Sequence, residues 1–159
     1  MRIAGDDVTR GLPIGDCERS AGRTVTSGEL ALFHSLSWVR GALHTDREAA
    51  RNGPYGELIA AGPVVVAIMA GLWSAGAQYR RLEEDHGVRL LAVLGSENRY
   101  LRPLRAGDTI HIESELTAAR ASASQPDRGV LTIRDRAIDQ TGLVLAEVST
   151  AILFERVTG

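Results

Sequence analysis

The chain has 159 residues, 44% of them apolar and 24% charged, which is the composition of one globular domain with its own core. A formal net charge of −2 gives no electrostatic reason to expect binding to nucleic acid or to an anionic membrane. The chain contains arginine but no lysine, which excludes Schiff-base chemistry and a phosphate-binding P-loop lysine.

The single cysteine, Cys17, cannot form an internal disulfide, and no Cys/His pattern has metal-binding spacing, so we expect neither a disulfide nor a metal. The first residues lack the apolar core of a signal peptide, which favours a reducing, cytoplasmic setting. We expect one domain over residues 1–159, in which the glycine-rich residues 1–22 are an irregular lead-in.

Two short patterns predict helices in the next part of the chain. Thr26 and Glu29 have the spacing of a capping box, and apolar residues at helical spacing follow them, which predicts a helix over residues 27–37. Residues 38–44 predict a loop. The same spacing from Thr45 to Glu48 predicts a short helix over residues 45–51, which ends at an Asn-Gly-Pro turn.

Residues 64–77 are the most unusual stretch, because only Ser74 among them carries a polar side chain. Pro63 suits the first turn of a helix, and Gly62 before it can serve as the cap. A helix that is apolar all round must be buried all round, and this one is too short to make a comfortable membrane span. We therefore expect a buried helix, followed over residues 80–87 by a charged, solvent-exposed segment.

The rest of the chain has the patterns of strands and turns. Strands are predicted over residues 88–94, 98–101, 109–116, 130–138 and 143–154, with a loop over 118–129 and a turn over 139–142. Helices followed by hairpin-connected strands predict an α+β fold in which an antiparallel sheet covers the buried helix. One sheet covers only one side of a helix, so we also expect a dimer or a second layer.

Four segments carry a resemblance to a known family. They are residues 22–29, the pair 36–37 with 43–46, residues 55–62 and residues 100–109. In this order they resemble the MaoC-like dehydratases, or (R)-specific enoyl-CoA hydratases, over residues 22–154. The resemblance implies a hotdog fold, which is a sheet wrapped around a long central helix. It also implies a dimer or higher oligomer, homomeric or heteromeric, and a substrate attached to CoA or to carrier-protein phosphopantetheine, with no separate cofactor.

The catalytic motif of that family is matched only in part. Its pattern is D-x-N-P-L-H in one-letter code. At the same spacing this chain has Val39 for the aspartate, Gly41 for the asparagine and His44 for the histidine. The family also often has a histidine just before the glycine that begins the central helix, and this chain has Ala61 there.

Adding water to an α,β-unsaturated thioester requires a base, an acid and a group that stabilises the enolate-like oxygen. A helix N-terminus presents amide donors and the positive end of the helix dipole, so the amides of Gly62, Val64 and Val65 are candidate contacts to the thioester carbonyl. His44 is the candidate acid/base, because imidazole titrates near neutral pH. The alternative is that His44 only hydrogen-bonds the local backbone.

Val39 cannot transfer a proton, so either His44 works alone or another group replaces the missing aspartate. The candidates for such a replacement are Tyr55, Glu57, Glu97 and Asn98. By their place in the motifs, Tyr55 and Gly41 are also expected to contact substrate. His34 and Asp46 favour structural roles, the latter in the first turn of the next helix.

The sequence leaves three functions open. The first is a MaoC-like hydratase or dehydratase, which is a lyase that acts on an acyl thioester. The second is a hotdog thioesterase, although residues 63–78 contain none of the carboxylates that such enzymes place on the central helix. The third is a degenerate subunit or an acyl-thioester-binding protein, which the loss of the aspartate at Val39 favours and the presence of His44 opposes.

Overall fold

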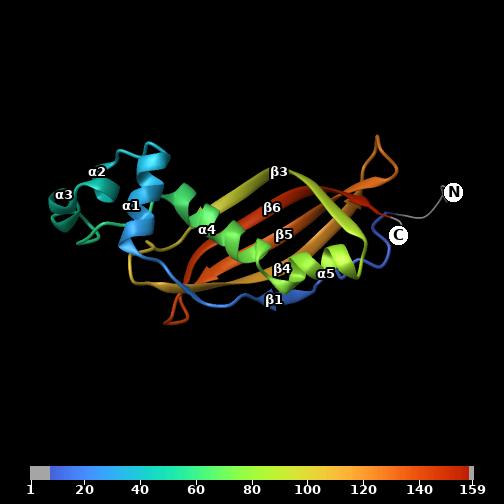
Figure 1. Cartoon of the computed structure of the whole chain (residues 1–159), viewed down its shortest axis with the longest axis horizontal. Coiled ribbons are helices and arrows are strands. Elements are labelled where there is room, and N and C mark those ends of the chain that lie inside the picture. The colour runs from blue at the N-terminus through green and yellow to red at the C-terminus, as the bar shows by residue number, and fades with distance from the viewer. Residues whose placement is uncertain (1–7, 158–159) are drawn as a thin grey trace.

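The computed structural model describes residues 8–157. The helices are α1 (Ser27–Leu36), α2 (Ala42–Thr45), α3 (Arg47–Arg51), α4 (Gly62–Ser74) and α5 (Ala77–Glu84). The strands are β1 (Cys17–Arg19), β2 (Arg23–Thr24), β3 (Val88–Tyr100), β4 (Thr109–Ala121), β5 (Arg128–Ile138) and β6 (Val144–Arg156). Figure 1 shows α4 lying along the long strands, with α1, α2 and α3 gathered at one end of the molecule.

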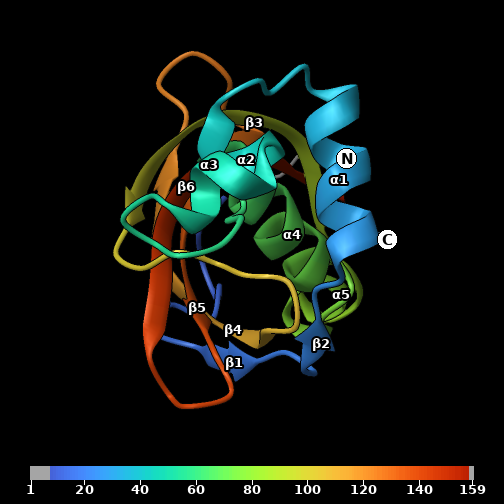
Figure 2. The ribbon, with the colours of Figure 1, turned by 90° about the vertical axis from the view of Figure 1, so that its left-hand side faces the viewer.

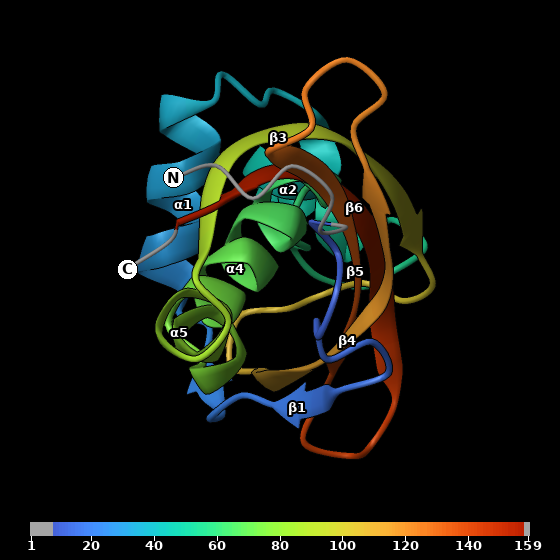
Figure 3. The same ribbon diagram turned by 90° about the vertical axis from the view of Figure 1, so that its right-hand side faces the viewer.

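The sheet has the strand order β1-β4-β5-β6-β3, and all its pairings are antiparallel. It curves around α4, as the two end-on views show (Figures 2 and 3). The predicted α+β arrangement of a sheet wrapped around a central helix is therefore confirmed. Within residues 8–157, no helix is both long and apolar enough to cross a membrane.

The strands expected over residues 88–94 and 98–101 are one strand, β3, which continues through Gly95. The other predicted strands are present, and most are longer than their sequence patterns. The expected loop over residues 118–129 shrinks, because β4 continues to Ala121 and β5 begins at Arg128. The lead-in is not wholly irregular either. Cys17–Arg19 forms β1, which pairs with residues 113–115 of β4. Three residues are too few to show an alternating pattern, and the pairing depends on the backbone groups of a distant strand.

The two capping patterns have different outcomes. Thr26 caps α1, because its hydroxyl accepts from the Glu29 amide at 3.2 Å and the Glu29 carboxylate accepts from the Thr26 amide at 2.8 Å. Thr45 is not a cap, because its hydroxyl donates to the Gly41 carbonyl at 3.2 Å. Thr45 is instead the last residue of α2, a short helix that begins inside the loop expected over residues 38–44. Asp46 caps α3, since its carboxylate accepts from two amides of the first turn at 3.0 Å. Asp46 is therefore the residue just before α3, whereas we expected it in the first turn of that helix.

The central helix is shorter than predicted. It ends at Ser74, and the predicted charged segment is part of a second helix, α5, which buries Gln78 and Leu82. Two polar contacts support this break. The carboxylate of Glu18 accepts from the Ala77 amide at 2.8 Å, and the Trp73 indole N–H donates to the Gln78 side chain at 3.0 Å.

One chain buries only one side of α4. Val64, Val65 and Met69 are buried against the sheet, whereas the opposite side is exposed. The exposed residues are Pro63, Ala67, Ala70, Gly71 and Ser74. Residues 91–100 of β3 are also exposed, and β3 lies at one end of the sheet. Burial all round, as the composition of α4 requires, thus needs a cover that residues 8–157 do not supply.

A buried carboxyl group separates two apolar clusters of the core. Asp135 of β5 is buried and accepts a hydrogen bond from the hydroxyl of Ser114 on β4. Ile112 and Ala137 lie on one side of this pair in the cluster that includes the first turns of α4, and Leu116 lies on the other side, in the cluster beneath α5. Burial raises the pKa of Asp135 from 3.8 to about 6.

This raised pKa predicts a pH dependence of stability. The folded chain binds the Asp135 proton more tightly than the unfolded chain, so the contribution of Asp135 falls as pH rises from 3.8 to about 6 and is then constant. Asp135→Asn keeps an oxygen that can accept from Ser114 and removes the charge. We expect it to raise the free energy of unfolding at pH 7 by up to about 3 kcal/mol, with little change at pH 4. Denaturant titrations from pH 4 to 8 measure this, and parallel curves for the two proteins would contradict it.

Candidate functional site

His44 lies on the short helix α2 and is half-buried. Its Nδ1 is 2.9 Å from the carbonyl oxygen of Ile59. Because a carbonyl can only accept, Nδ1 carries the proton, and Nε2 of the neutral ring is the basic nitrogen. The backbone contact that we considered as an alternative role therefore occupies only one nitrogen. It orients the ring and leaves Nε2 able to exchange a proton.

Gly41 leaves one side of this imidazole uncovered. A Cβ atom on Gly41 would lie 3.2 Å from Cδ2 of His44 and 3.7 Å from Nε2. A side chain here would therefore crowd the ring at Cδ2. The expected contact of Gly41 with substrate stays a prediction.

The loop between α1 and α2 begins with a left-handed residue. The Trp38 amide donates to the carbonyl of Ser35 and the Val39 amide to that of His34, which is the double closure of a Schellman motif. Trp38 has a φ of 58°, a conformation that favours glycine, and the guanidinium of Arg40 lies 5.4 Å from the centre of its exposed ring. The closure directs Val39 onto the core, where it packs against the cluster that includes α4.

The start of α4 has one amide that meets no protein acceptor. Val64 and Val65 both donate to the Ala61 carbonyl, at 2.9 and 3.3 Å, so neither amide is the free donor that we expected. Pro63 has no N–H. The Gly62 amide has no acceptor among residues 8–157. It lies at the positive end of a 13-residue helix whose first turn contains no acid.

Tyr100, at the end of β3, lies directly over this glycine. A Cβ atom on Gly62 would lie 2.6 Å from Cζ of Tyr100 and 2.9 Å from its hydroxyl oxygen. A side chain on residue 62 would therefore have to displace the ring of Tyr100, a residue that is 50% exposed. Sequence reasoning missed this neighbour, since a tyrosine in a predicted strand gives no signal of which helix it will meet.

His34 of α1 is also part of the site. It is only 4% exposed, and its Nε2 accepts the Ala61 amide proton at 3.2 Å. Its ring centre is 5.4 Å from that of His44. Burial, and then the neighbouring His44, lower the pKa of His34, so the neutral form is favoured. The expected structural role agrees with these contacts, but the residue is much closer to His44 than sequence reasoning indicated.

None of the candidates to replace the aspartate hydrogen-bonds His44 in the described part of the chain. Glu57 pairs with the Arg105 guanidinium at 2.9 Å. Tyr55 is exposed in the segment between α3 and α4, and its substrate contact stays a prediction. Glu97 and Asn98 are exposed on β3. Residues 8–157 also contain no group of three or more His, Cys, Asp or Glu side chains that could hold a metal.

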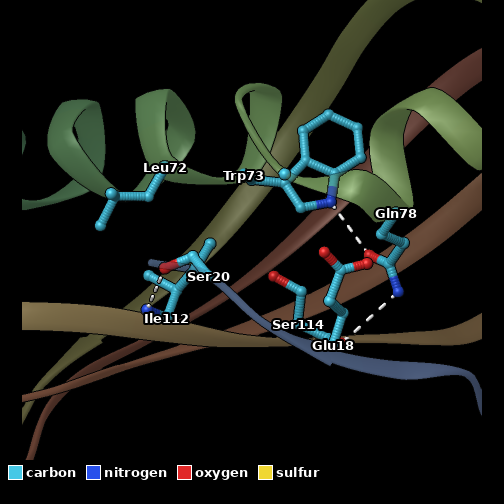
Figure 4. Close-up of a pocket in the computed structure, with 8 residues that line it drawn as sticks. Glu18, Ser20, Leu72, Trp73, Gln78, Ile112 and Ser114 are labelled. Carbon is cyan, nitrogen blue, oxygen red and sulfur yellow. Dashed lines mark hydrogen bonds between the residues drawn. The ribbon is translucent and has the colours of Figure 1, made fainter. Parts of the chain in front are cut away.

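A small cavity with a mixed polar and apolar lining lies near the other end of α4. Figure 4 shows the Trp73 indole nitrogen directed at Gln78, with Glu18 and Ser114 beside them. The cavity has a volume of about 10 Å³, which is room for one water molecule and not for an acyl group. It lies near the C-terminus of a 13-residue helix, so roughly 15–20 Å separate it from Gly62. This cavity is therefore separate from the group around His44 and Gly62.

Residues 12–137 match the model of a protein family described as MaoC like domain. The chain belongs to the MaoC-like family. It is 31% identical over 138 residues to a mesaconyl-CoA hydratase from Cereibacter sphaeroides, an alignment that covers 86% of this chain and 37% of that protein. The chain thus spans little more than a third of the length of that relative.

Solved structures agree with this membership. A MaoC-like dehydratase from Rhodospirillum rubrum superposes with a TM-score of 0.78 at 28% identity, covering 93% of this MaoC-like chain and 96% of the other. A Mycobacterium tuberculosis protein described as a double hotdog fold gives a TM-score of 0.74 at 21% identity. That match covers 99% of this chain and 46% of the other, so the sheet wrapped around α4 is a hotdog fold.

The contact between Gly62 and Tyr100 can be tested by adding a methyl group. We expect Gly62→Ala to lower the free energy of unfolding by on the order of 1 kcal/mol, because the phenol must move. Gly71→Ala is the matched control on the same helix, since a Cβ atom there meets nothing. It should be neutral or stabilising by up to about 1 kcal/mol. Denaturant titrations compare the two variants, and equal effects would contradict the close approach.

Proposed function

We propose that this MaoC-like domain is a hydratase or dehydratase that acts on an acyl thioester of CoA or of a carrier-protein phosphopantetheine. One observation carries the proposal: the backbone segment that hydrogen-bonds the His44 imidazole leads directly to the free amide of α4. Nδ1 of His44 donates to the carbonyl of Ile59, and Gly62 lies three residues after Ile59 in the chain. This arrangement supports a reaction in which one group moves a proton while another stabilises a carbonyl oxygen.

In the hydration direction, the thioester oxygen accepts the Gly62 amide proton at the positive end of α4. Nε2 of His44 takes a proton from water as the water oxygen bonds to the β-carbon. The electron pair of the double bond moves towards the carbonyl, which gives the enolate-like state. The imidazolium then returns its proton to the α-carbon. The net change is the addition of H and OH across the double bond, and dehydration is the reverse.

His44 serves as both base and acid in this scheme, because Val39 is apolar and packs against the core. The same observation favours a second candidate, a subunit that binds acyl thioesters without catalysing their conversion. The thioesterase alternative has less support. Residues Gly62–Ser74 of α4 contain no carboxylate to attack the thioester or to activate water.

Crotonyl-CoA is a direct probe of the proposed reaction. We expect the native chain to reduce the enoyl absorbance without releasing free thiol. His44→Ala should lower kcat about 100-fold or more, because the proton-transfer group is lost. His86→Ala is the matched control, since His86 lies beyond α5 and outside the site. Release of thiol would indicate a thioesterase instead.

An inactive native chain leads to a second experiment. If no acyl thioester in a panel of CoA and carrier-protein substrates reacts, the lyase proposal fails. The double substitution Val39→Asp with Gly41→Asn then tests the second candidate. Hydratase activity gained by this variant over an inert parent would identify a degenerate subunit. Isothermal titration with a saturated acyl-CoA measures whether the parent still binds the substrate class.

We further propose that a second hotdog chain covers the exposed side of α4 by pairing along β3. A 13-residue strand at the end of a sheet offers a row of backbone donors and acceptors, and long exposed edges of this kind normally acquire a cover. The exposed small residues of α4 also allow close approach of another backbone. A second copy of this chain gives a homodimer, and a related chain gives a heteromer.

Light scattering after size-exclusion chromatography tests the homodimer. We expect the mass of two chains, and Val93→Lys on β3 should shift the population towards monomer, because charged edge residues oppose strand pairing. Leu143→Lys, at an exposed position before β6, is the control and should leave the dimer population unchanged. A native monomer that keeps its fold would contradict the homodimer.

A further inference from the structure

Three consecutive amides before α4 are each hydrogen-bonded to a different part of the fold. The Ile59 amide donates to the carbonyl of Leu43 at 3.1 Å, and the Ala60 amide donates to that of Leu104 at 2.8 Å. The third amide, of Ala61, donates to the side chain of His34 at 3.2 Å. The fourth amide, of Gly62, is the first without a protein acceptor among residues 8–157. His34 therefore decides which amide is the first free one.

His34 also lies beside His44. The centres of the two imidazole rings are 5.4 Å apart. Since Nε2 accepts the Ala61 amide proton, Nδ1 carries the proton of the neutral ring. One buried imidazole on α1 thus joins α2, which bears the acid/base, to the cap of α4, which precedes the free amide.

We propose that His34 is a positioning residue that holds His44 and the Gly62 amide in the relative placement that the reaction needs. The inference rests on the proposed hydratase or dehydratase function. It does not make His34 an acid or a base, because its Nε2 is occupied by a backbone amide. Small displacements of reacting groups are costly in rate, so a residue that fixes two segments of a site affects turnover without touching substrate.

This role requires a neutral His34. A protonated ring has no acceptor at Nε2, so it would release the Ala61 amide, and its charge would face the positive end of α4. The titratable group facing His34 is His44 of α2, and the first turn of α4 contributes no acid. Burial and His44 both disfavour the charge on His34, so its neutral state persists while His44 carries the transferred proton.

The interaction with Ala61 can be isolated by two amide substitutions. The side-chain oxygen of His34→Gln can reach the place of Nε2 and accept the Ala61 amide proton, whereas that of His34→Asn is one methylene shorter. We expect His34→Gln to keep kcat within about threefold and His34→Asn to lose about tenfold or more, with KM changed less than kcat. His111→Gln is the matched control, because His111 is the other buried histidine and lies on β4.

Two measurements on the free protein test the placement without activity. Nitrogen NMR shifts should show His34 as the neutral Nδ1–H form at pH 7. Hydrogen exchange at the Ala61 amide should be at least about tenfold faster in His34→Asn than in the native chain or in His34→Gln, while amides of β5 stay unchanged. A protonated His34 at pH 7, or equal exchange in all three proteins, would overturn the contact.

The outcomes separate this inference from the proposed function. If the native chain converts no thioester, the hydratase proposal fails, and the tautomer and exchange data still decide whether His34 holds the cap of α4. If the native chain is active and His34→Asn keeps native kcat, the positioning role is wrong although the function stands. A pH profile of kcat whose acidic limb moves in His34→Gln and not in His111→Gln supports the requirement for neutral His34.

Discussion

The backbone that leads into α4 is the constraint on which the rest of the site depends. A helix start leaves several amides without intrahelical partners, and each buried one needs an acceptor. Here Leu43, Leu104 and the His34 side chain satisfy three successive amides, and the Ala61 carbonyl takes two more inside the helix. What is left is one donor, on Gly62, at a place where an added side chain would meet the ring of Tyr100. Among residues 8–157 the Gly62 amide is therefore left free, because these acceptors are already bonded to its neighbouring amides.

The same helix couples the site to assembly. Its apolar composition is suited to burial on all sides, but the sheet of one chain covers only the side that bears Val64, Val65 and Met69. The exposed side of α4 and the edge of β3 left unpaired within residues 8–157 would both be covered by the same proposed partner chain. Tyr100 ends β3 and lies over Gly62, so a chain that pairs with β3, as proposed, would lie beside the proposed site.

The sequence predicted features that depend on nearby residues. The capping box of Thr26 with Glu29 was confirmed, and so was the turn over residues 139–142, where Asp139 accepts from the Thr141 and Leu143 amides. Family motifs added the hotdog fold. Contacts between distant residues were missed. The carboxylate of Glu18 accepts from the Ala77 amide at the start of α5, 59 residues away in the sequence. The His34 ring accepts from the Ala61 amide, 27 residues away. Hydrophobic periodicity indicates which face of an element is buried. It does not indicate which polar group on another element will accept a hydrogen bond from a backbone amide.

The replacement of aspartate by Val39 changes where the site can stabilise charge. In the described part of the chain no carboxylate hydrogen-bonds His44, and the imidazole of His34 lies beside it, with the ring centres 5.4 Å apart. An imidazolium at His44 therefore gains no ion pair. The substrate oxygen, by contrast, would meet the Gly62 amide and the positive end of α4. In the proposed reaction, stabilisation would thus be directed at the enolate-like oxygen rather than at the protonated base. This would favour an imidazolium that returns its proton quickly to the α-carbon, which is the step that a single acid/base group must complete in that reaction.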